Sequence, residues 1–324
     1  KLLLQMIFMT FTIAYLRGYL KCADDENRII TRNESLSRYL ITTMPNEKHL
    51  LVFILCISTC SAIKIASFNI QIFGKAKSQK TEVMKIISSI IRRYDLVFIQ
   101  EIRDMSGKAF KRLLMSVNKY NSCKRDEPKT KYHGKTSPRY GRTSSKEQYG
   151  VIYNPKKIKL ISESEVAVSM ADFERPPFCY SFNTVGRNPL TFAALTTHID
   201  PDDVEAEMDN LYSTVAQCTG TTGTDDIIVL GDMNAGCRYL PQTKKQELKF
   251  SKDSAYRWLI SDDMDTTVGR QDCAYDRFIV RGQRLIRRIV LNSAKPMKFD
   301  RIFNLKPDLA KAVSDHYPIE MEIV

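Results

Sequence analysis

The sequence predicts a layered α/β fold with mixed β-sheets. Several short runs rich in Ile, Val, Leu and Phe are typical of buried strands. Helical patterns lie between some of these runs, and this alternation favours a layered arrangement. Other runs follow one another without a helix, which indicates antiparallel portions. The predicted strands are 63–68, 95–100, 148–153, 157–168, 178–184, 191–197 and 226–231.

Two helices are predicted from apolar stripes with helical spacing. One stripe covers residues 83–91 and the other covers 204–215. For the second helix we expect Asp200 as the N-cap and Pro201 at the first helical position. The span 124–147 is rich in Pro, Gly, Ser and Lys, so it is predicted to be an exposed basic loop.

The composition indicates a globular protein with a basic surface. Of the 324 residues, 43% are hydrophobic and 27% are charged, which excludes a disordered chain. The formal net charge is +12 at pH 7. A basic surface favours a polyanionic partner, and nucleic acid, an anionic membrane and an acidic glycan all fit this description.

The N-terminal part is predicted to lie outside the fold. Residues 44–62 resemble a secretory signal peptide, with Lys48 and His49 before an apolar stretch at 50–57 and small residues at 60–62. A signal anchor or a buried helix is the alternative. Residues 1–43 are expected to be an upstream segment, and residues 63–324 a single domain of a secreted, extracellular protein.

Secretion permits disulfides, but the cysteine count leaves the pairing open. The expected mature region holds five cysteines, so at least one is free or pairs with another chain. They are Cys123, Cys179, Cys218, Cys237 and Cys273. No Cys-x-x-Cys pair is present, which argues against a structural zinc site.

Polar residues follow several of the predicted strands at the point where each strand ends. In α/β folds such residues meet at one edge of a sheet, where functional sites are common. Any one of them alone is more often an ordinary solvated residue, but several strands share the pattern. The residues are Asn69, Glu101, His198 and Asp232, with Asp315 and His316 just before the last apolar segment.

This residue set is suited to phosphodiester hydrolysis. Such a reaction needs a base, an acid and cations that offset charge on the phosphate. His198 and His316 are candidates for base and acid near neutral pH, and Glu147 and Asp276 are candidates to orient them.

The acidic residues of this set indicate a metal site. Asp232 and Asn234 are two residues apart, so in an extended segment they share a face. Glu101 adds a hard oxygen ligand, which favours Mg²⁺ or Ca²⁺ over zinc.

From residue 63 onward the chain resembles deoxyribonuclease I and its relatives in the endonuclease/exonuclease/phosphatase superfamily. The AGC and KEQY motifs and the basic charge are more similar to the basic gamma-type relatives. The matching segments, in family order, are IKIASFNIQIFG (63–74), RRYDLVFIQEIRD (92–104), GRTSSKEQY (141–149), LTTHIDPDDVEAEMDNLY (195–212), VLGDMNAGCRYL (229–240), DTTVGRQDCAYDR (265–277) and SDHYPIE (314–320).

The resemblance implies a four-layer α/β sandwich, with two packed mixed β-sheets flanked by helices. It implies a secreted, metal-dependent endonuclease that hydrolyses double-stranded DNA to 5′-phosphate ends with Mg²⁺ and Ca²⁺. A monomer without stable membrane association is expected. The apolar residues with which the pancreatic relatives bind actin have no counterpart near 134–136, so tight actin binding is not expected.

The resemblance also implies roles for individual residues. His198 and His316 would be the catalytic acid–base pair, oriented by Glu147 and Asp276 respectively. Cys237 and Cys273 would form a disulfide, and Asp265 and Thr267 match part of a structural Ca²⁺ loop. The metal and the scissile phosphate would be held by Asn69, Glu101, Asp232, Asn234 and Asp315. DNA contacts would come from Arg103, Arg175, Tyr239 and Tyr275.

The chain departs from the family pattern at three places. Gln71 replaces a common Arg, and Ser145 replaces a Tyr that contacts the minor groove, which weakens the expectation of tight duplex contact. The sequence 175–177 lacks an acidic residue that would help to form a second Ca²⁺ site. Cys123, Cys179 and Cys218 have no family partner, so they are expected to be free thiols.

Two other functions remain compatible with the sequence. One is a different hydrolase of the superfamily, such as a sphingomyelinase or an inositol phosphatase, although DCAYDR (272–277) argues against it. The other is a secreted DNA- or partner-binding protein without catalysis, which the changes at Gln71 and Ser145 suggest.

Overall fold

The structure is a computed structural model that describes residues 62–119, 131–169 and 171–324. The predicted upstream segment 1–43 and nearly all of the predicted signal peptide, together with Cys123, lie outside the described residues. Among the described helices, none has the length and apolar character needed to cross a membrane.

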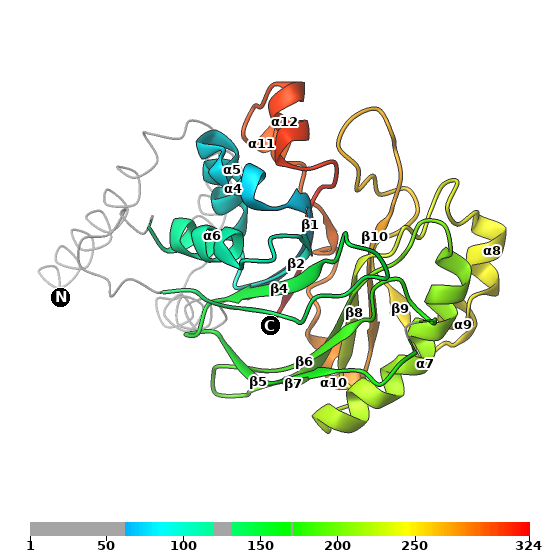
Figure 1. Cartoon of the computed structure of the whole chain (residues 1–324). Helices are drawn as coiled ribbons and strands as arrows, with labels where there is room; N and C mark the ends of the chain where they lie inside the picture. Colours follow the sequence, from blue (N-terminus) through cyan, green and yellow to red (C-terminus); the bar gives the residue numbers. More distant parts are fainter. Residues whose placement is uncertain (1–61, 120–130, 170) are drawn as a thin grey trace, which may run out of the picture. The chain divides into compact units, whose positions relative to one another are not determined.

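The described residues contain twelve strands and nine helices, drawn in Figure 1. The strands are β1 (Ile63–Phe73), β2 (Leu96–Ile102), β3 (His133–Thr136), β4 (Gln148–Tyr153), β5 (Ile158–Glu165), β6 (Phe178–Thr184), β7 (Thr191–His198), β8 (Ile227–Asp232), β9 (Arg257–Trp258), β10 (Asp276–Arg281), β11 (Lys295–Pro296) and β12 (Ile319–Ile323). The helices are α4 (Lys75–Gln79), α5 (Thr81–Ile91), α6 (Lys108–Lys119), α7 (Val204–Thr222), α8 (Gln242–Glu247), α9 (Lys249–Lys252), α10 (Gln283–Arg288), α11 (Phe299–Ile302) and α12 (Pro307–Val313).

These strands form two six-stranded mixed sheets. The first has the order β11-β12-β1-β2-β4-β3, and the second has the order β5-β6-β7-β8-β10-β9. The pairs β1–β2 and β7–β8 are parallel, whereas the other neighbours are antiparallel. In both parallel pairs the chain returns through a helical crossover, with α4 and α5 between β1 and β2 and α7 between β7 and β8, as parallel pairing requires.

The two sheets pack face to face, and helices cover their outer faces. Side chains such as Phe98 of the first sheet and Phe182 of the second meet in one buried cluster, with ring centroids 5.8 Å apart. A second cluster joins the first sheet to α5, α6 and α12, and a third joins the other sheet to α7 and α9 (Figure 1). The predicted four-layer sandwich is therefore confirmed.

The predicted basic loop at 124–147 is wrong for part of its length. Residues 133–136 form the edge strand β3, which pairs with β4, and Tyr140 pairs with Glu147 in an isolated bridge. Tyr140 is buried in the core between the sheets, which accounts for this order. The composition of the segment did not predict it, because two tyrosines among many polar residues hardly change the average polarity.

The predicted N-cap of the second helix is also wrong. Helix α7 begins at Val204 and its N-cap is Asp203, so Asp200 and Pro201 lie in the turn before it. The carboxylate of Glu207, within the first turns of α7, accepts a hydrogen bond from the Asp200 amide at 3.0 Å. This contact holds the preceding turn outside the helix.

Two disulfides join described cysteines. One connects Cys237 to Cys273, the pair that the family resemblance implied. The other connects Cys179 of β6 to Cys218 of α7, so the expectation of free thiols at these two positions is wrong. Both Cys179 and Cys218 are fully buried, and spacing along the sequence cannot reveal that a strand and a helix 39 residues apart face each other.

Candidate active site

Asp232 lies at the centre of the polar cluster because of its place in the second sheet. It ends β8, and its neighbours in register are His198 on β7 and Asp276 on β10. The strands approach closely at Gly231, where a Cβ atom would lie 1.9 Å from the carbonyl oxygen of Thr197. Only glycine fits there, so the sequence Gly-Asp is required for this alignment.

Both predicted histidines face the same carboxylate oxygen of Asp232. The Nε2 atom of His198 lies 3.6 Å from Asp232 Oδ2, and the Nε2 atom of His316 lies 3.4 Å from it. His316 comes from the segment between α12 and β12, far from β7 in the sequence. The structure therefore brings the two imidazoles to one point between the sheets.

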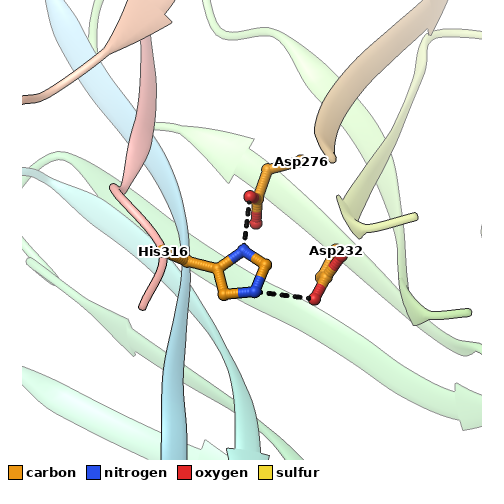
Figure 2. A group of neighbouring side chains, drawn as sticks. All are labelled: Asp232, Asp276 and His316. Carbon is orange, nitrogen blue, oxygen red and sulfur yellow. Dashed lines mark hydrogen bonds and ion pairs between the residues drawn. The ribbon is translucent and has the colours of Figure 1, made fainter. Parts of the chain in front are cut away.

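Each imidazole has a carboxylate on its other ring nitrogen. His198 Nδ1 lies 2.8 Å from Glu147 Oε2, and His316 Nδ1 lies 2.8 Å from Asp276 Oδ2. Figure 2 shows His316 between Asp276 and Asp232. These contacts fix the orientation of both rings and direct both Nε2 atoms to the space around Asp232.

The first sheet supplies Asn69 and Glu101 to the same place. The Asn69 amide nitrogen donates to Asp232 Oδ2 at 2.9 Å and to Glu101 Oε1 at 3.1 Å, so it links the two sheets. Glu101 has a left-handed backbone with φ 61°, and the pairing of β2 with β4 shifts next to it. Such a conformation is costly for a residue with a side chain and is characteristic of functional sites.

Gln71 and Asp315 complete the cluster on its exposed side. Gln71 Nε2 donates to Asp315 Oδ2 at 2.8 Å, and the backbone of Gln71 is left-handed with φ 38°. Lys77 stabilises this left-handed backbone, because its ammonium donates to the carbonyl oxygens of Ile70, Gln71 and Val313. The sequence flagged Gln71 only as a departure and gave no signal for Lys77.

Arg103 and Arg175 are tied to the carboxylates of the site. Arg103 Nη2 lies 2.7 Å from Glu147 Oε1 and 3.2 Å from Glu101 Oε2. Arg175 donates through Nε to the carbonyl oxygen of His198 at 3.0 Å and lies 3.9 Å from Glu147. Both guanidiniums therefore stabilise the acidic side of the site, whatever further contacts they make.

Tyr239 and Tyr275 form an aromatic wall next to His316. Their ring centroids are 5.2 Å apart, and the Tyr275 ring lies 6.4 Å from that of His316. The Tyr275 hydroxyl is buried and has no hydrogen-bond partner within the described protein. A buried hydroxyl without a partner is uncommon in proteins and is often found beside a functional site.

Asn234 follows Asp232 and stabilises the loop behind the site. Its backbone amide donates to Asp232 Oδ1 at 3.1 Å, and its side-chain nitrogen donates to the carbonyl oxygen of Ile199 at 2.9 Å. The backbone φ of Asn234 is 48°, which Asn tolerates better than most residues. Thr267 pairs with His316 in an isolated β-bridge, and Asp265 lies two residues before it.

A buried polar network beneath the site was missed from the sequence. Gln100 Nε2 donates to Ser67 Oγ at 3.1 Å and to Thr196 Oγ1 at 3.3 Å, which connects β1 and β2 to β7. The available signal was a polar residue near the end of each of three predicted strands: Ser67, Gln100 and Thr196. Polar side chains buried in a core almost always form hydrogen bonds, so these three could be expected to bond to one another.

The charges of the site shift the pKa values of its groups in opposite directions. Burial and the Arg175 charge oppose protonation of His198, but Glu147 and Asp232 outweigh them and raise its pKa. Burial likewise opposes protonation of His316, yet Asp232 and Asp276 raise its pKa well above the usual value.

The carboxylates respond to the same charges. Burial would raise the pKa of Glu147, but the hydrogen bond from His198 and the nearby charges lower it. For Asp232 the charges of the two imidazoles outweigh burial and lower the pKa. Burial dominates at Asp276 and raises its pKa to about 6. Two imidazoles with different surroundings thus share one ionised carboxylate, an arrangement suited to proton transfer in both directions.

The oxygen-rich donor set fits a hard divalent cation. Asp232, Asp276 and His316 each offer a ligand atom within 4.8 Å of one another (Figure 2). Glu101 and Asp315 add carboxylates nearby, and Asp315 Oδ1 is a buried oxygen that accepts no hydrogen bond from the described residues. Mg²⁺ prefers oxygen to nitrogen ligands, so the carboxylate oxygens of this set are the better ligands.

Comparison with known proteins supports the same family assignment as the motifs. The chain matches the Endonuclease/Exonuclease/phosphatase family over residues 66–316. Deoxyribonuclease-1 of Bos taurus is 33% identical over 267 residues, which cover 81% of this chain and 92% of the relative. For Deoxyribonuclease-1 of Homo sapiens the identity is 34% over 265 residues, covering 80% and 92% respectively.

Solved structures with far lower sequence identity share the fold. The crystal structure of humanized D. rerio TDP2 has a TM-score of 0.55 to this chain at 11% identity, and the match covers 82% of this chain and 100% of that one. At this identity the likeness shows the four-layer fold alone.

Proposed function

Because this chain belongs to the deoxyribonuclease I family within the endonuclease/exonuclease/phosphatase superfamily, we propose that it is a secreted endonuclease that hydrolyses double-stranded DNA with divalent cations. The observation that carries this proposal is the convergence of His198 and His316 on Asp232, each backed by its own carboxylate. The two disulfides among described cysteines support an extracellular location.

The two imidazoles form the acid–base pair. One Nε2 atom takes a proton from the attacking water, and the other donates a proton to the oxygen that leaves the phosphate. Glu147 and Asp276 keep the rings in position and stabilise their charged forms. Water attack that releases the 3′ oxygen leaves 5′-phosphate ends, which is the outcome we propose.

Three carboxylates would hold the metal ion. Glu101, Asp232 and Asp315 surround the space in front of the imidazoles, and the bound cation, Mg²⁺ with Ca²⁺ support, supplies charge that offsets the negative charge on the phosphate. Asn69 and Asn234, expected as ligands, turn their amide nitrogens to Asp232, Glu101 and a backbone carbonyl. We assign both amides to positioning.

DNA would bind across the edge where these groups meet. We propose that Tyr239 and Tyr275, whose rings lie next to His316, contact phosphate oxygens. Arg103 and Arg175 add positive charge beside Glu147, and we propose that this charge attracts the phosphate backbone. Residues 63–324 carry 42 Lys and Arg against 32 Asp and Glu, a net charge of +10 that strengthens attraction to the duplex and makes it dependent on salt.

The branch of the family, the oligomeric state and the absence of actin or membrane binding are proposed from the sequence. The basic charge and the AGC and KEQY motifs favour the gamma-type branch of the family. We propose a monomer without tight actin binding or stable membrane association. Size-exclusion chromatography with and without monomeric actin tests both: a single monomeric peak that actin does not shift is expected.

A plasmid-nicking assay tests the proposal. The purified protein is expected to convert supercoiled DNA to open circles in Mg²⁺ and Ca²⁺, and EDTA is expected to stop the reaction. The products should be joined by ligase without prior kinase treatment, as 5′-phosphate ends allow. Glu163→Gln, which removes a surface carboxylate on β5, serves as a control that should retain full activity.

A substrate panel separates the proposal from its alternatives. Sphingomyelin and inositol phosphates are offered in parallel with DNA. Cleavage of either in preference to DNA, or DNA binding without any cleavage, would contradict the proposal.

A further inference from the structure

The loop that begins at Asp265 lies directly against the segment that carries His316. Thr267 pairs with His316 in an antiparallel bridge, and the Val268 amide donates to the Asp315 carbonyl at 2.7 Å. On the other side, the Tyr317 amide donates to the Thr266 carbonyl at 2.7 Å. The position of this loop therefore sets the position of the His316 backbone.

Both oxygens of the Asp265 carboxylate are engaged by groups of the protein itself. Oδ1 accepts hydrogen bonds from the Thr267 amide at 2.9 Å and from its hydroxyl at 2.8 Å. Oδ2 lies 3.1 Å from the ammonium nitrogen of Lys298. The ion pair is largely shielded from water, since the Asp265 side chain is 17% exposed and that of Lys298 is 29% exposed.

Lys298 connects the loop to elements that are distant in sequence. It is the N-cap residue of α11, and it follows β11, which pairs with β12 beyond His316. Its ammonium also lies 5.6 Å from the centre of the Tyr317 ring. One cation thus contacts both chain segments that meet at the Thr267–His316 bridge.

This arrangement does not fit a calcium ion at Asp265, although the sequence matched part of a calcium loop there. Calcium requires about 6–8 oxygen ligands at close range, and Asp265 would be the main source of negative charge. With Lys298 in place, the carboxylate is already neutralised and a second cation beside the ammonium would be repelled. The residues present favour the internal cation.

We propose that the Lys298 ammonium takes the place of a structural calcium ion at this loop and acts as a positioning residue for His316. The loop then keeps its shape at any calcium concentration. Lys298 does not touch the reacting atoms. It acts through Asp265, Thr267 and the bridge to His316. This inference goes beyond the proposed function, and its main test does not need catalysis.

Thermal unfolding in EGTA and in saturating calcium tests the proposal. Lys298→Met is compared with the wild type and with Lys295→Met, which removes a more exposed lysine of the same segment whose partner, Glu320, is 3.8 Å away. In EGTA, Lys298→Met is expected to lower the Tm by about 3–6 °C relative to Lys295→Met. Calcium should restore most of this loss, because Asp265 is then free to bind it.

Calcium at the catalytic centre can raise the Tm of every variant. The deciding quantity is therefore the rise in Tm that calcium causes in Lys298→Met beyond the rise that it causes in the wild type. The double variant Asp265→Asn/Lys298→Met should gain no more from calcium than the wild type. A wild-type gain as large as that of Lys298→Met, or equal Tm values for Lys298→Met and Lys295→Met in EGTA, would overturn the proposal.

Two further measurements distinguish positioning from general stabilisation. In Mg²⁺ with EGTA, well below the Tm, Lys298→Met should lower kcat for plasmid nicking with little change in KM, and calcium should restore kcat. Lys298→Arg keeps the cation and should remain independent of calcium even if Lys298→Met does not fold. Calcium dependence of Lys298→Arg would contradict the proposal.

Discussion

Replacing Glu147 with Gln tests the role of the carboxylates behind the imidazoles. The substitution preserves the shape of the side chain and removes its charge. In the structure Glu147 lies 2.8 Å from His198 Nδ1, is nearly buried, and also pairs with Arg103. The charge-assisted hydrogen bond therefore becomes a neutral one in a shielded environment.

The expected loss follows from the strength of that bond. A hydrogen bond to a charged group contributes about 1.5–3 kcal/mol, and a neutral one about 0.5–1.5 kcal/mol. The difference is about 1.5 kcal/mol, which corresponds to a decrease of about tenfold in kcat/KM for Glu147→Gln. Since the carboxylate also orients the ring, about tenfold is a lower bound, and the loss can extend to about a hundredfold.

The assay is the initial rate of plasmid nicking, with circular dichroism to verify folding. Glu163→Gln is the matched control, because its side chain lies on β5 and, among the described residues, forms an ion pair with the exposed Lys135. A loss of less than about twofold in folded Glu147→Gln, or an equal loss in Glu163→Gln, would refute the account of Glu147 as the partner of His198.

Three further changes probe the remaining parts of the site and fold. Cys179→Ser/Cys218→Ser should lower stability by about 4 kcal/mol on the chain-entropy estimate for a 39-residue separation, measured by urea unfolding, with kcat at 25 °C unchanged. Arg103→Met should lower kcat more than it raises KM, because the guanidinium holds two carboxylates of the site; a change confined to KM would show that it acts in DNA binding alone. Burial lowers the pKa of Lys77 to about 8. Below that pH the buried ammonium lowers the free energy of unfolding, and this loss of stability fades as the pH rises from about 8 to 10.5. The Tm deficit of Lys77→Met should accordingly grow from pH 7 to pH 9.5, and a deficit that shrinks would contradict this sign.

The sequence predicted the framework of the fold because its strands are nearly continuous apolar runs. The segments 95–100 and 226–231 became β2 and β8, with shifts of one or two residues at their ends. Helix α6 was missed, although Phe110, Leu113 and Val117 form a buried stripe. Its high content of Lys and Arg conceals that stripe.

The candidate site was only partly accessible from the sequence. Its residues stand at the ends of strands, so their types and positions could be recognised. The contacts between them depend on register and on the packing of two sheets: Asn69 and Asp232 are 163 residues apart, and Gln71 and Asp315 are 244 apart. Neither pairing follows from local patterns. The ion pair between Lys298 and Asp265 belongs to the same class of long-range contact.

The central claim is that the two imidazoles act as one unit over Asp232. A double-mutant cycle on plasmid-nicking rates, with His198→Asn, His316→Asn and the double variant, tests it most directly. Each single variant should lose at least about a thousandfold in kcat, and the double variant should be little slower than either, because residues that act as a unit are not additive. Losses that multiply in the double variant, or a single variant that retains near wild-type activity, would contradict the claim.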